Sequence, residues 1–258
     1  MPPDTPLATD GYRHLAWAGV ELRWGRHCLL IDPLEDTGRL ADYLGPPRGP
    51  VDRAEPRAWM TTDVLLTHAH PDHYDPAAIA RQLQGGGRVW ASPYVAHAVA
   101  ADGFPVRPVA VGETYHVGPF RATPVPASDA FGDEQVSWVV GSARRRVLHA
   151  GDTLWHGHWW ATARAHGPVD VAFLPINGVL GSPPGLTRTT VPGTMTPEQA
   201  VEAAYVLGAR AVCPIHYGLF DNPPAYVESP APRAALGAAA AARGIPVAPA
   251  AGAVAWDD

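Results

Sequence analysis

The sequence predicts a single α/β (α+β) domain that occupies residues 1–258. Strand-like and helix-like segments alternate in both flanks of the chain, whereas the middle shows the alternating apolar and polar residues of β-strands. Hydrophobic residues make up 47% of the chain, which is enough to bury a substantial core. We therefore expect no second independent domain, and residues 1–10 are expected to form a loose N-terminal tail.

The first half of the chain is predicted to open with β-structure and to continue with helices and strands in alternation. The predicted elements are strands over 15–23 and 27–31, a Pro- and Gly-rich loop over 46–56, a buried strand at 64–66, a helix over 77–83, a strand over 88–91 and a helix over 93–101. Asp75 is a good N-cap for the first helix, and Pro76 suits its first position, where no N–H is needed.

The second half is predicted to begin with β-structure and to end with two further helices. The predicted elements are strands over 114–125, 136–140, 146–150 and 169–176, a helix from Thr196 to Gly208, a strand over 211–215, an Ala-rich helix and a final strand that includes 245–248. The segment Thr196-Pro197-Glu198-Gln199 predicts a helix start, because it combines a capping box with Pro at the first helical position.

Charge and residue usage exclude several classes of function. All 19 basic residues are arginine, so the P-loop and Schiff-base or pyridoxal-phosphate chemistry, which need a lysine amine, are excluded. The net charge is −6, and the densest basic run, Arg144-Arg145-Arg146, is short and lies at a predicted hairpin turn. A nucleic-acid enzyme normally shows a broader basic face.

The expected cellular context follows from similar observations. Cys28 and Cys213 lie in apolar strand-like runs and are expected to be reduced, buried thiols. No stretch has the pattern of a signal peptide or the length of a transmembrane helix. We therefore expect a cytoplasmic protein with a small-molecule substrate and with neither a nucleic-acid nor a membrane partner.

The segment Thr67-His68-Ala69-His70-Pro71-Asp72-His73 is the strongest functional signal in the chain. It follows the apolar run 64–66, so a buried strand is expected to deliver these side chains to a loop at its C-terminal end. Neutral imidazole nitrogen and carboxylate oxygen suit zinc and similar divalent ions, and so dense a set favours more than one ion. A solvated, His-rich turn is the simpler alternative, but this spacing after a strand is uncommon.

Two later positions extend the candidate metal site. Asp152 follows the predicted strand 146–150, and His216 follows the predicted strand 211–215. Each places a ligand-type side chain at the exit of a strand, where open α/β sheets gather their functional groups. Taken singly, the aspartate is more often part of a structural turn and the histidine is more often packed, but jointly they predict a metal site.

These segments, at 66–73, 150–153 and 214–218, together with the opening hairpin that ends at Ile31-Asp32-Pro33, resemble the metallo-β-lactamase superfamily of metal-dependent hydrolases. Within it, residues 194–200 make the chain most similar to the branch that contains ascorbate-6-phosphate lactonase. The resemblance implies a four-layer αββα sandwich with a dinuclear site on one edge. It also implies the ligands: His68 and His70 for the first metal, Asp72, His73 and His216 for the second, and Asp152 as the bridge between them.

Asp129 marks a departure from the family's pattern. In the family, the loop after the strand that matches 123–127 supplies a third histidine to the first metal, and Asp129 stands in its place here. If it binds, the three carboxylates and a bridging hydroxide would carry about −4 against +4 from two divalent ions, whereas a histidine would leave about +1. A roughly neutral site would favour neutral esters, lactones or amides over phosphates. The alternative is that Asp129 points away and only one metal binds well.

The mechanism implied by such a site is hydrolysis by a metal-bound hydroxide, because the metal lowers the pKa of its water towards about 7. Asp72 is expected to pass a proton to the leaving group. Substrate selection is expected from the stretch 154–160, although its tryptophans could instead pack a helix onto the sheet. The candidates are Trp155, Trp159, Asn177 and Tyr217 for the substrate pocket, and His156 and His158 for an oxyanion donor or general acid.

Three classes of function remain open. The leading one is an enzyme, a dinuclear metallohydrolase with two divalent ions, zinc or else manganese or iron, that acts on a small ester, lactone or amide. The second is an iron-dependent oxidoreductase or lyase on the same scaffold. His70 argues against it, because in the diiron flavoprotein pattern the ligand at this position resembles a glutamate. The third is a non-catalytic binding protein with a degenerate first metal site.

Overall fold

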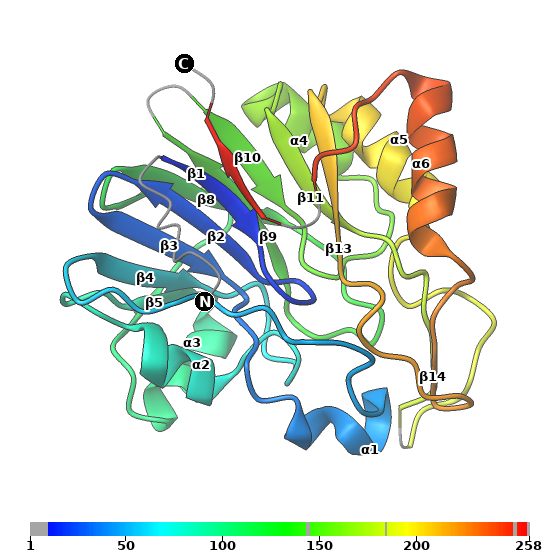
Figure 1. The fold of residues 1–258 in the computed structure, drawn as a ribbon, viewed down its shortest axis with the longest axis horizontal. Helices are drawn as coiled ribbons and strands as arrows, with labels where there is room; N and C mark the ends of the chain where they lie inside the picture. The colour runs from blue at the N-terminus through cyan, green and yellow to red at the C-terminus, as the bar shows by residue number, and fades with distance from the viewer. Residues whose placement is uncertain (1–9, 143–144, 184, 250–251, 257–258) are drawn as a thin grey trace, which may run out of the picture.

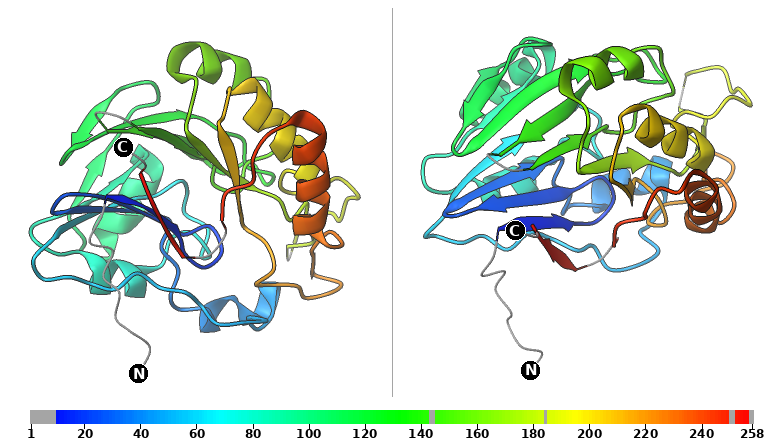
Figure 2. Two further views of the ribbon diagram at one scale, coloured as in Figure 1. Left: turned by 45° about the horizontal axis from the view of Figure 1, so that its top comes forward. Right: turned by 90° about the horizontal axis from the view of Figure 1, so that it is seen from above.

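Two β-sheets pack face to face at the centre of the molecule, and helices cover both outer faces (Figures 1 and 2). The computed structural model describes residues 10–142, 145–183, 185–249 and 252–256. The arrangement confirms the predicted four-layer αββα sandwich, formed as one domain.

The first sheet has seven strands in the order β15-β1-β2-β3-β4-β5-β6. They are β1 (Gly11–His14), β2 (Val20–Trp24), β3 (His27–Ile31), β4 (Thr61–Leu65), β5 (Val89–Ala91), β6 (Val106–Pro108) and β15 (Ala253–Ala255). Strands β3 to β6 run parallel, and α2 (Pro76–Gln82) and α3 (Pro93–Ala101) form the crossovers from β4 to β5 and from β5 to β6. Asp75 caps α2 as predicted, since its Oδ1 accepts from the Ala77 and Ala78 N–H groups.

The second sheet has six strands in the order β13-β11-β10-β9-β8-β7. They are β7 (Tyr115–Val117), β8 (Phe120–Pro126), β9 (Val136–Gly141), β10 (Arg146–His149), β11 (Val171–Pro175) and β13 (Ala211–Ile215). Its outer face is covered by α4 (Trp159–His166), α5 (Pro197–Val206) and α6 (Pro232–Arg243) (Figure 1). The predicted capping box is formed at the start of α5 by Thr196 and Gln199.

Short elements lie beyond the sheets at one edge of the sandwich. The helical turns η1 (Gly38–Leu40) and α1 (Ala41–Leu44) follow β3, and β12 (Leu180–Gly181) pairs with β14 (Tyr226–Val227). Tyr43 of α1 contacts Tyr226 of β14, with ring centroids 5.7 Å apart. These elements therefore meet above the ends of the strands.

Apolar side chains fill three layers of the sandwich. The layer between the sheets includes Leu22, Leu29, Trp138 and Phe173. Separate layers pack α4, α5 and α6 onto the second sheet, and α2 and α3 onto the first. Because the strands face apolar layers on both sides, the polar side chains of the candidate site lie just beyond the strand ends.

Three predicted strands differ from the observed ones. The segment predicted as one strand over 114–125 is a hairpin, in which β7 and β8 pair antiparallel. The segment predicted as one strand over 15–23 is divided by a tight turn, in which Trp17 has a φ of +60° and the Leu15 N–H donates to the Gly19 carbonyl at 2.8 Å. The segment 245–248 forms only a single bridge, between Val247 and Val212, because the prolines on either side of Val247, at 246 and 249, lack the N–H that a ladder requires. The last strand, β15, lies further along the chain.

The N-terminal tail, the two cysteines and the length of the helices were also predicted from the sequence. Asp10 is not loose, since its carboxylate accepts from the Gly25 N–H at 2.6 Å; residues 1–9, and Arg144 of the predicted basic turn, lie outside the described residues. Cys28 and Cys213 are free and buried, as predicted. Across the part of the chain that the structure describes, every helix is too short or too polar to span a bilayer.

Candidate metal centre

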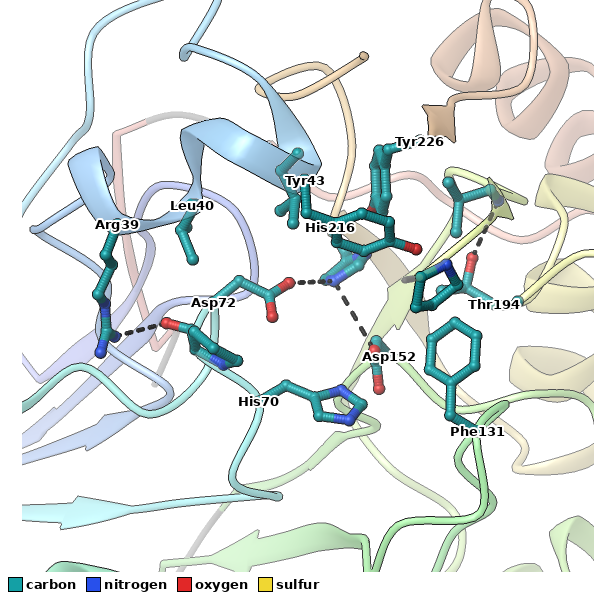
Figure 3. Close-up of a pocket in the computed structure, with 15 residues that line it drawn as sticks. Arg39, Leu40, Tyr43, His70, Asp72, Phe131, Asp152, Thr194, His216 and Tyr226 are labelled. Atoms are coloured by element: carbon teal, nitrogen blue, oxygen red, sulfur yellow. Dashed lines mark hydrogen bonds and ion pairs between the residues drawn. The ribbon is translucent and has the colours of Figure 1, made fainter. Parts of the chain in front are cut away.

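The predicted ligand-type residues lie at one edge of the sandwich, where strands of both sheets end. Residues 68–73 follow β4 of the first sheet, whereas Asp152 and His216 follow β10 and β13 of the second. Parallel strands bring their carboxyl ends to the same edge, so segments distant in sequence meet there. Figure 3 shows side chains from these three segments around one shared space.

The first cluster consists of His68, His70, Asp129 and Asp152, each of which has one ligand-type atom within 4.8 Å of the others. His68 Nε2 lies 3.6 Å from Asp152 Oδ1, and His70 Nδ1 lies 3.7 Å from Asp129 Oδ2. The His68 side chain is fully buried, whereas that of His70 is 24% exposed. The first cluster is therefore the more open side of the centre.

The second cluster consists of Asp72, His73 and His216, which are all buried. Asp72 Oδ2 lies 3.3 Å from His216 Nε2 and 3.7 Å from His73 Nε2. The other oxygen of Asp152, Oδ2, lies 3.9 Å from His73 Nε2 and 4.0 Å from His216 Nε2. The two oxygens of Asp152 thus face different clusters, as a bridging ligand requires.

Asp32, at the end of β3, orients the imidazoles of His73 and His68, the first directly and the second through Thr67. Its Oδ2 lies 2.8 Å from His73 Nδ1 and accepts from Thr67 Oγ1 at 2.6 Å, while its Oδ1 accepts from the Thr67 N–H at 2.9 Å. Thr67 Oγ1 also lies 2.9 Å from His68 Nδ1. Sequence reasoning noted Asp32 only as the end of the opening hairpin, because its role depends on contacts that form after folding.

These contacts leave the Nε2 atoms of His68 and His73 directed at the clusters. Both atoms are buried and have no hydrogen-bond partner among the described residues. An unpaired buried nitrogen is unfavourable in a protein interior, whereas metal-bound histidine normally uses its other nitrogen for a hydrogen bond of this kind. The residues present therefore fit divalent metal ions at both clusters.

The protonation of the two neighbouring histidines shows the same fit. Burial lowers the pKa of His68 to about 3, so its imidazole is neutral and can act as a ligand. Burial also opposes a charge on His73, but the carboxylates of Asp72 and Asp32 outweigh it and raise the pKa of His73 to about 10. Without a cation, a proton on His73 balances these carboxylates. A divalent ion would take over that role and release the proton.

Trp17 positions two residues of the second cluster, and no pattern in the sequence marked it. Its Nε1–H donates to Asp72 Oδ2 at 2.9 Å, and its ring centroid lies 4.0 Å from that of His216. Its carbonyl accepts from the His216 N–H at 2.8 Å and lies 2.9 Å from His14 Nε2. A positive φ is uncommon for a bulky residue and persists where the surrounding contacts hold it in place.

Asp129 points towards the first cluster rather than away from it. Its Oδ1 accepts from the backbone N–H groups of Phe131 and Asp133, at 2.6 and 3.2 Å, so the loop fixes the carboxylate. Its Oδ2 faces His70, and its side chain is 2% exposed. Burial and the neighbouring Asp152 raise the pKa of Asp129, which a bound cation would reverse.

Two further polar residues support the first cluster and were not found from the sequence. Gln135 Nε2 donates to Asp152 Oδ1 at 3.0 Å, and Asp133 Oδ2 lies 2.9 Å from His70 Nε2. Both belong to the loop that also carries Asp129. A run of acidic and amide residues after a strand was the only sequence signal for them.

A cavity of about 240 Å³ opens beside the two clusters. Arg39 contributes to the wall, but its Nη2 group donates to the carbonyl oxygens of Pro71 and Tyr74. The wall also contains the ligand-type side chains of His70, Asp72, Asp152 and His216 (Figure 3). The cavity is also lined by Leu40, Tyr43, Leu44, Phe131, Val179, Thr194 and Tyr226.

The aromatic stretch after Asp152 does not line this cavity. Trp159 is buried in the core between α4 and the second sheet, and Trp155 packs against the same core. His156 stacks on Trp159 with ring centroids 4.3 Å apart, and burial lowers its pKa to about 4. His158 precedes α4 as its N-cap residue. Trp159 is therefore packed in the core, and none of these four residues lines the cavity of the two clusters, so their predicted pocket and acid roles stay predictions.

Asn177 and Tyr217 also lie outside the cavity wall. Asn177 follows β11 and is hydrogen-bonded to two residues of the wall, Thr194 and Tyr226. Tyr217 lines a separate groove next to α6. Asn177 thus acts on the cavity only through its neighbours.

The comparisons with known proteins agree with this fold and site. Residues 27–217 match the family described as Beta-lactamase superfamily domain, so the chain belongs to the metallo-β-lactamase superfamily. Within it, the chain belongs to the UPF0173 metal-dependent hydrolases. It is 31% identical over 216 residues to the UPF0173 metal-dependent hydrolase of Symbiobacterium thermophilum, which covers 81% of this chain and 84% of that protein.

Two further matches describe the extent of the likeness. The UPF0173 metal-dependent hydrolase of Rubrobacter xylanophilus is 32% identical over 171 residues, which cover 61% of this chain and 64% of that relative, just under two thirds of its length. Among solved structures, the metallo hydrolase Igni18 from Ignicoccus hospitalis superposes with a TM-score of 0.70 at 20% identity. That match covers 97% of this chain and 100% of Igni18, and it concerns the fold alone.

Proposed function

We propose that the protein is a dinuclear metallohydrolase that cleaves a small, uncharged ester, lactone or amide. The position of Asp152 carries the proposal, because its two carboxylate oxygens face two separate clusters of ligand-type side chains. When bound, two divalent ions would lower the pKa of a water molecule and polarise the scissile carbonyl group. Zinc suits this set of imidazole and carboxylate ligands, and manganese or iron could use the same set.

The charges around the cavity favour an uncharged substrate. Asp72, Asp129 and Asp152 contribute three negative charges, which with a hydroxide would offset about +4 from two divalent ions. Arg39 is the lining residue that could attract an anion, but its Nη2 group is directed at backbone carbonyl oxygens. A phosphate group would therefore find little net positive charge.

The finer resemblance to the ascorbate-6-phosphate lactonase branch stays a prediction. The segment that carries this resemblance, 194–200, contains Thr194, which lines the cavity, and Thr196, which caps α5. Part of the resemblance therefore concerns residues that support the cavity wall and the start of α5. The charge argument keeps lactones within the proposed substrate class but not phosphorylated ones. A cytoplasmic location and a role without nucleic acid or membrane also remain proposals.

Metal stoichiometry of the wild type beside Asp129→Ala tests the dinuclear site. We expect two ions per chain in the wild type and one in the variant, measured by elemental analysis, since Asp129 supplies a ligand to the first cluster. Asp52→Ala is the matched control, because the Asp52 side chain is 52% exposed and forms an ion pair with Arg13, away from both clusters. One ion in both proteins would mean that the first site is degenerate.

A substrate screen tests the reaction class. Nitrophenyl esters, lactones and anilides are compared with nitrophenyl phosphate on the metal-loaded wild type. We expect turnover of at least one neutral substrate and little of the phosphate. A phosphate monoester cleaved faster than every neutral compound would refute the substrate class. A folded, metal-free and inactive protein would favour a binding role, and a visible spectrum after anaerobic purification would favour iron chemistry.

A further inference from the structure

Tyr226 lines the cavity, and its phenol oxygen accepts a hydrogen bond from Asn177, which lies outside the cavity wall. Asn177 Nδ2 donates to Tyr226 Oη at 2.8 Å. Asn177 Oδ1 accepts from Thr194 Oγ1, which in turn accepts from the Val179 N–H at 3.4 Å. Because the Tyr226 oxygen already accepts a hydrogen bond, the phenol's own hydrogen is available to a different acceptor.

Nothing in the described part of the chain accepts this hydrogen, although Tyr226 is buried. Tyr226 lines the cavity together with Asp72, Asp152 and His216 (Figure 3). Burial raises the pKa of Tyr226 well above its ordinary value, so the phenol stays protonated at neutral pH. Tyr226 thus brings a neutral donor to the wall of the cavity, and the charges of Asp72 and Asp152 also raise the pKa of this phenol.

The rest of the wall is mostly apolar. Leu40, Leu44, Phe131 and Val179 line it around Tyr226 and the clusters. A dry cavity of about 150 Å³ can hold a guest of the size of benzene. The cavity here, at about 240 Å³, has room for one such group and for the few atoms of a carbonyl and its leaving group.

We propose that Tyr226 is a catalytic residue that donates a hydrogen bond to the carbonyl oxygen of the substrate, and that this substrate carries an apolar group about the size of a phenyl ring. The proposal rests on the hydrolase function above. Water adds to the carbonyl carbon, the bond from that carbon to the leaving oxygen or nitrogen breaks, and an acid and an alcohol or amine form. The Tyr226 proton stays on the phenol, and its hydrogen bond strengthens as the carbonyl oxygen gains negative charge.

Binding of two matched, non-hydrolysable ligands tests the donor without any turnover. Propiophenone is the ketone isostere of methyl benzoate, and propylbenzene has nearly the same shape without the oxygen. On metal-loaded protein, we expect Tyr226→Phe to weaken propiophenone about tenfold and to leave propylbenzene unchanged, as measured by titration calorimetry. Tyr12→Phe is the control, since Tyr12 is an equally buried tyrosine in the core between the sheets. An unchanged affinity for the ketone in Tyr226→Phe, or no binding of either ligand to the wild type, would overturn the proposal.

Kinetics on methyl benzoate separate this inference from the proposed function. Loss of one oxyanion donor reduces kcat by about 10²-fold, so we expect that loss in Tyr226→Phe with KM changed only a few-fold. Asn177→Asp keeps the phenol but offers it a carboxylate acceptor, so the same fall in kcat is expected while the ring remains. Wild-type kcat in Asn177→Asp would refute the donor role. A wild type that binds propiophenone selectively but cleaves no ester would refute the hydrolase and leave the binding inference standing.

Discussion

The two clusters of the candidate centre differ in how their ligands are held. In the second cluster, Asp72 is fixed by Trp17 and His73 by Asp32, and all four side chains are buried. In the first cluster, His70 is partly exposed and contacts Asp133, whose side chain is 53% exposed. The second cluster is therefore part of the folded core, whereas the first depends on a loop.

This difference predicts unequal metal sites. A ligand whose direction is already fixed by buried neighbours loses little freedom when it binds a metal, and its supporting hydrogen bonds raise affinity. Buried contacts are also screened less by water and salt than exposed ones. We expect the second cluster to bind its ion more tightly and the first cluster to lose its ion first during dialysis against a chelator.

Asp152→Asn should have the largest effect, because the two oxygens of Asp152 face different clusters. Metal ions contribute several kcal/mol to such reactions, so we expect kcat/KM on a neutral ester to fall by about 10³-fold. Elemental analysis should show that both ions bind more weakly. Asp52→Asn is the exposed control and should match the wild type. Loss of only one ion, with activity within tenfold of the wild type, would contradict a bridging role.

Asp32→Asn should affect the second cluster more than the first, because Asp32 contacts His73 directly and reaches His68 only through Thr67. The two oxygens of Asp32 receive the Thr67 N–H and O–H groups and face His73 Nδ1, so an amide nitrogen there would meet a donor. Loss of such a partner weakens metal binding by about 10–100-fold. Competition with a chromophoric chelator should place this loss in the tighter of the two sites. A loss confined to the weaker site would reverse the assignment of the clusters.

Side-chain type and position after a strand explain what the sequence could predict of the site. His68, Asp152 and His216 were predictable because their side-chain types bind metals and because each follows an apolar run that forms a strand. Trp17 and Tyr226 carry no such mark. Their roles arise from Asp72, which is 55 residues from Trp17, and from Asn177, which is 49 residues from Tyr226.

The fold was predictable where local signals agree with the tertiary structure. Asp75 with Pro76, and Thr196 with Pro197, fixed the starts of α2 and α5, since caps act within one turn of helix. The turn at Trp17 was missed because a positive φ in a tryptophan is set by its contacts and not by its own preference. Trp159 was open to two interpretations because aromatic density near a ligand fits both a pocket and a packed helix.

Asp133→Asn should have the smallest effect and completes the comparison with Asp32→Asn. Asp133 lies 2.9 Å from His70 Nε2 in the same way that Asp32 lies 2.8 Å from His73 Nδ1, but Asp133 is largely exposed. Exposed pairs contribute about 0.2–1 kcal/mol, so we expect affinity at the first cluster to fall no more than about fivefold. The fall should shrink further in 0.5 M salt, whereas that of Asp32→Asn should not. Equal losses in the two variants would show that burial does not separate the two clusters.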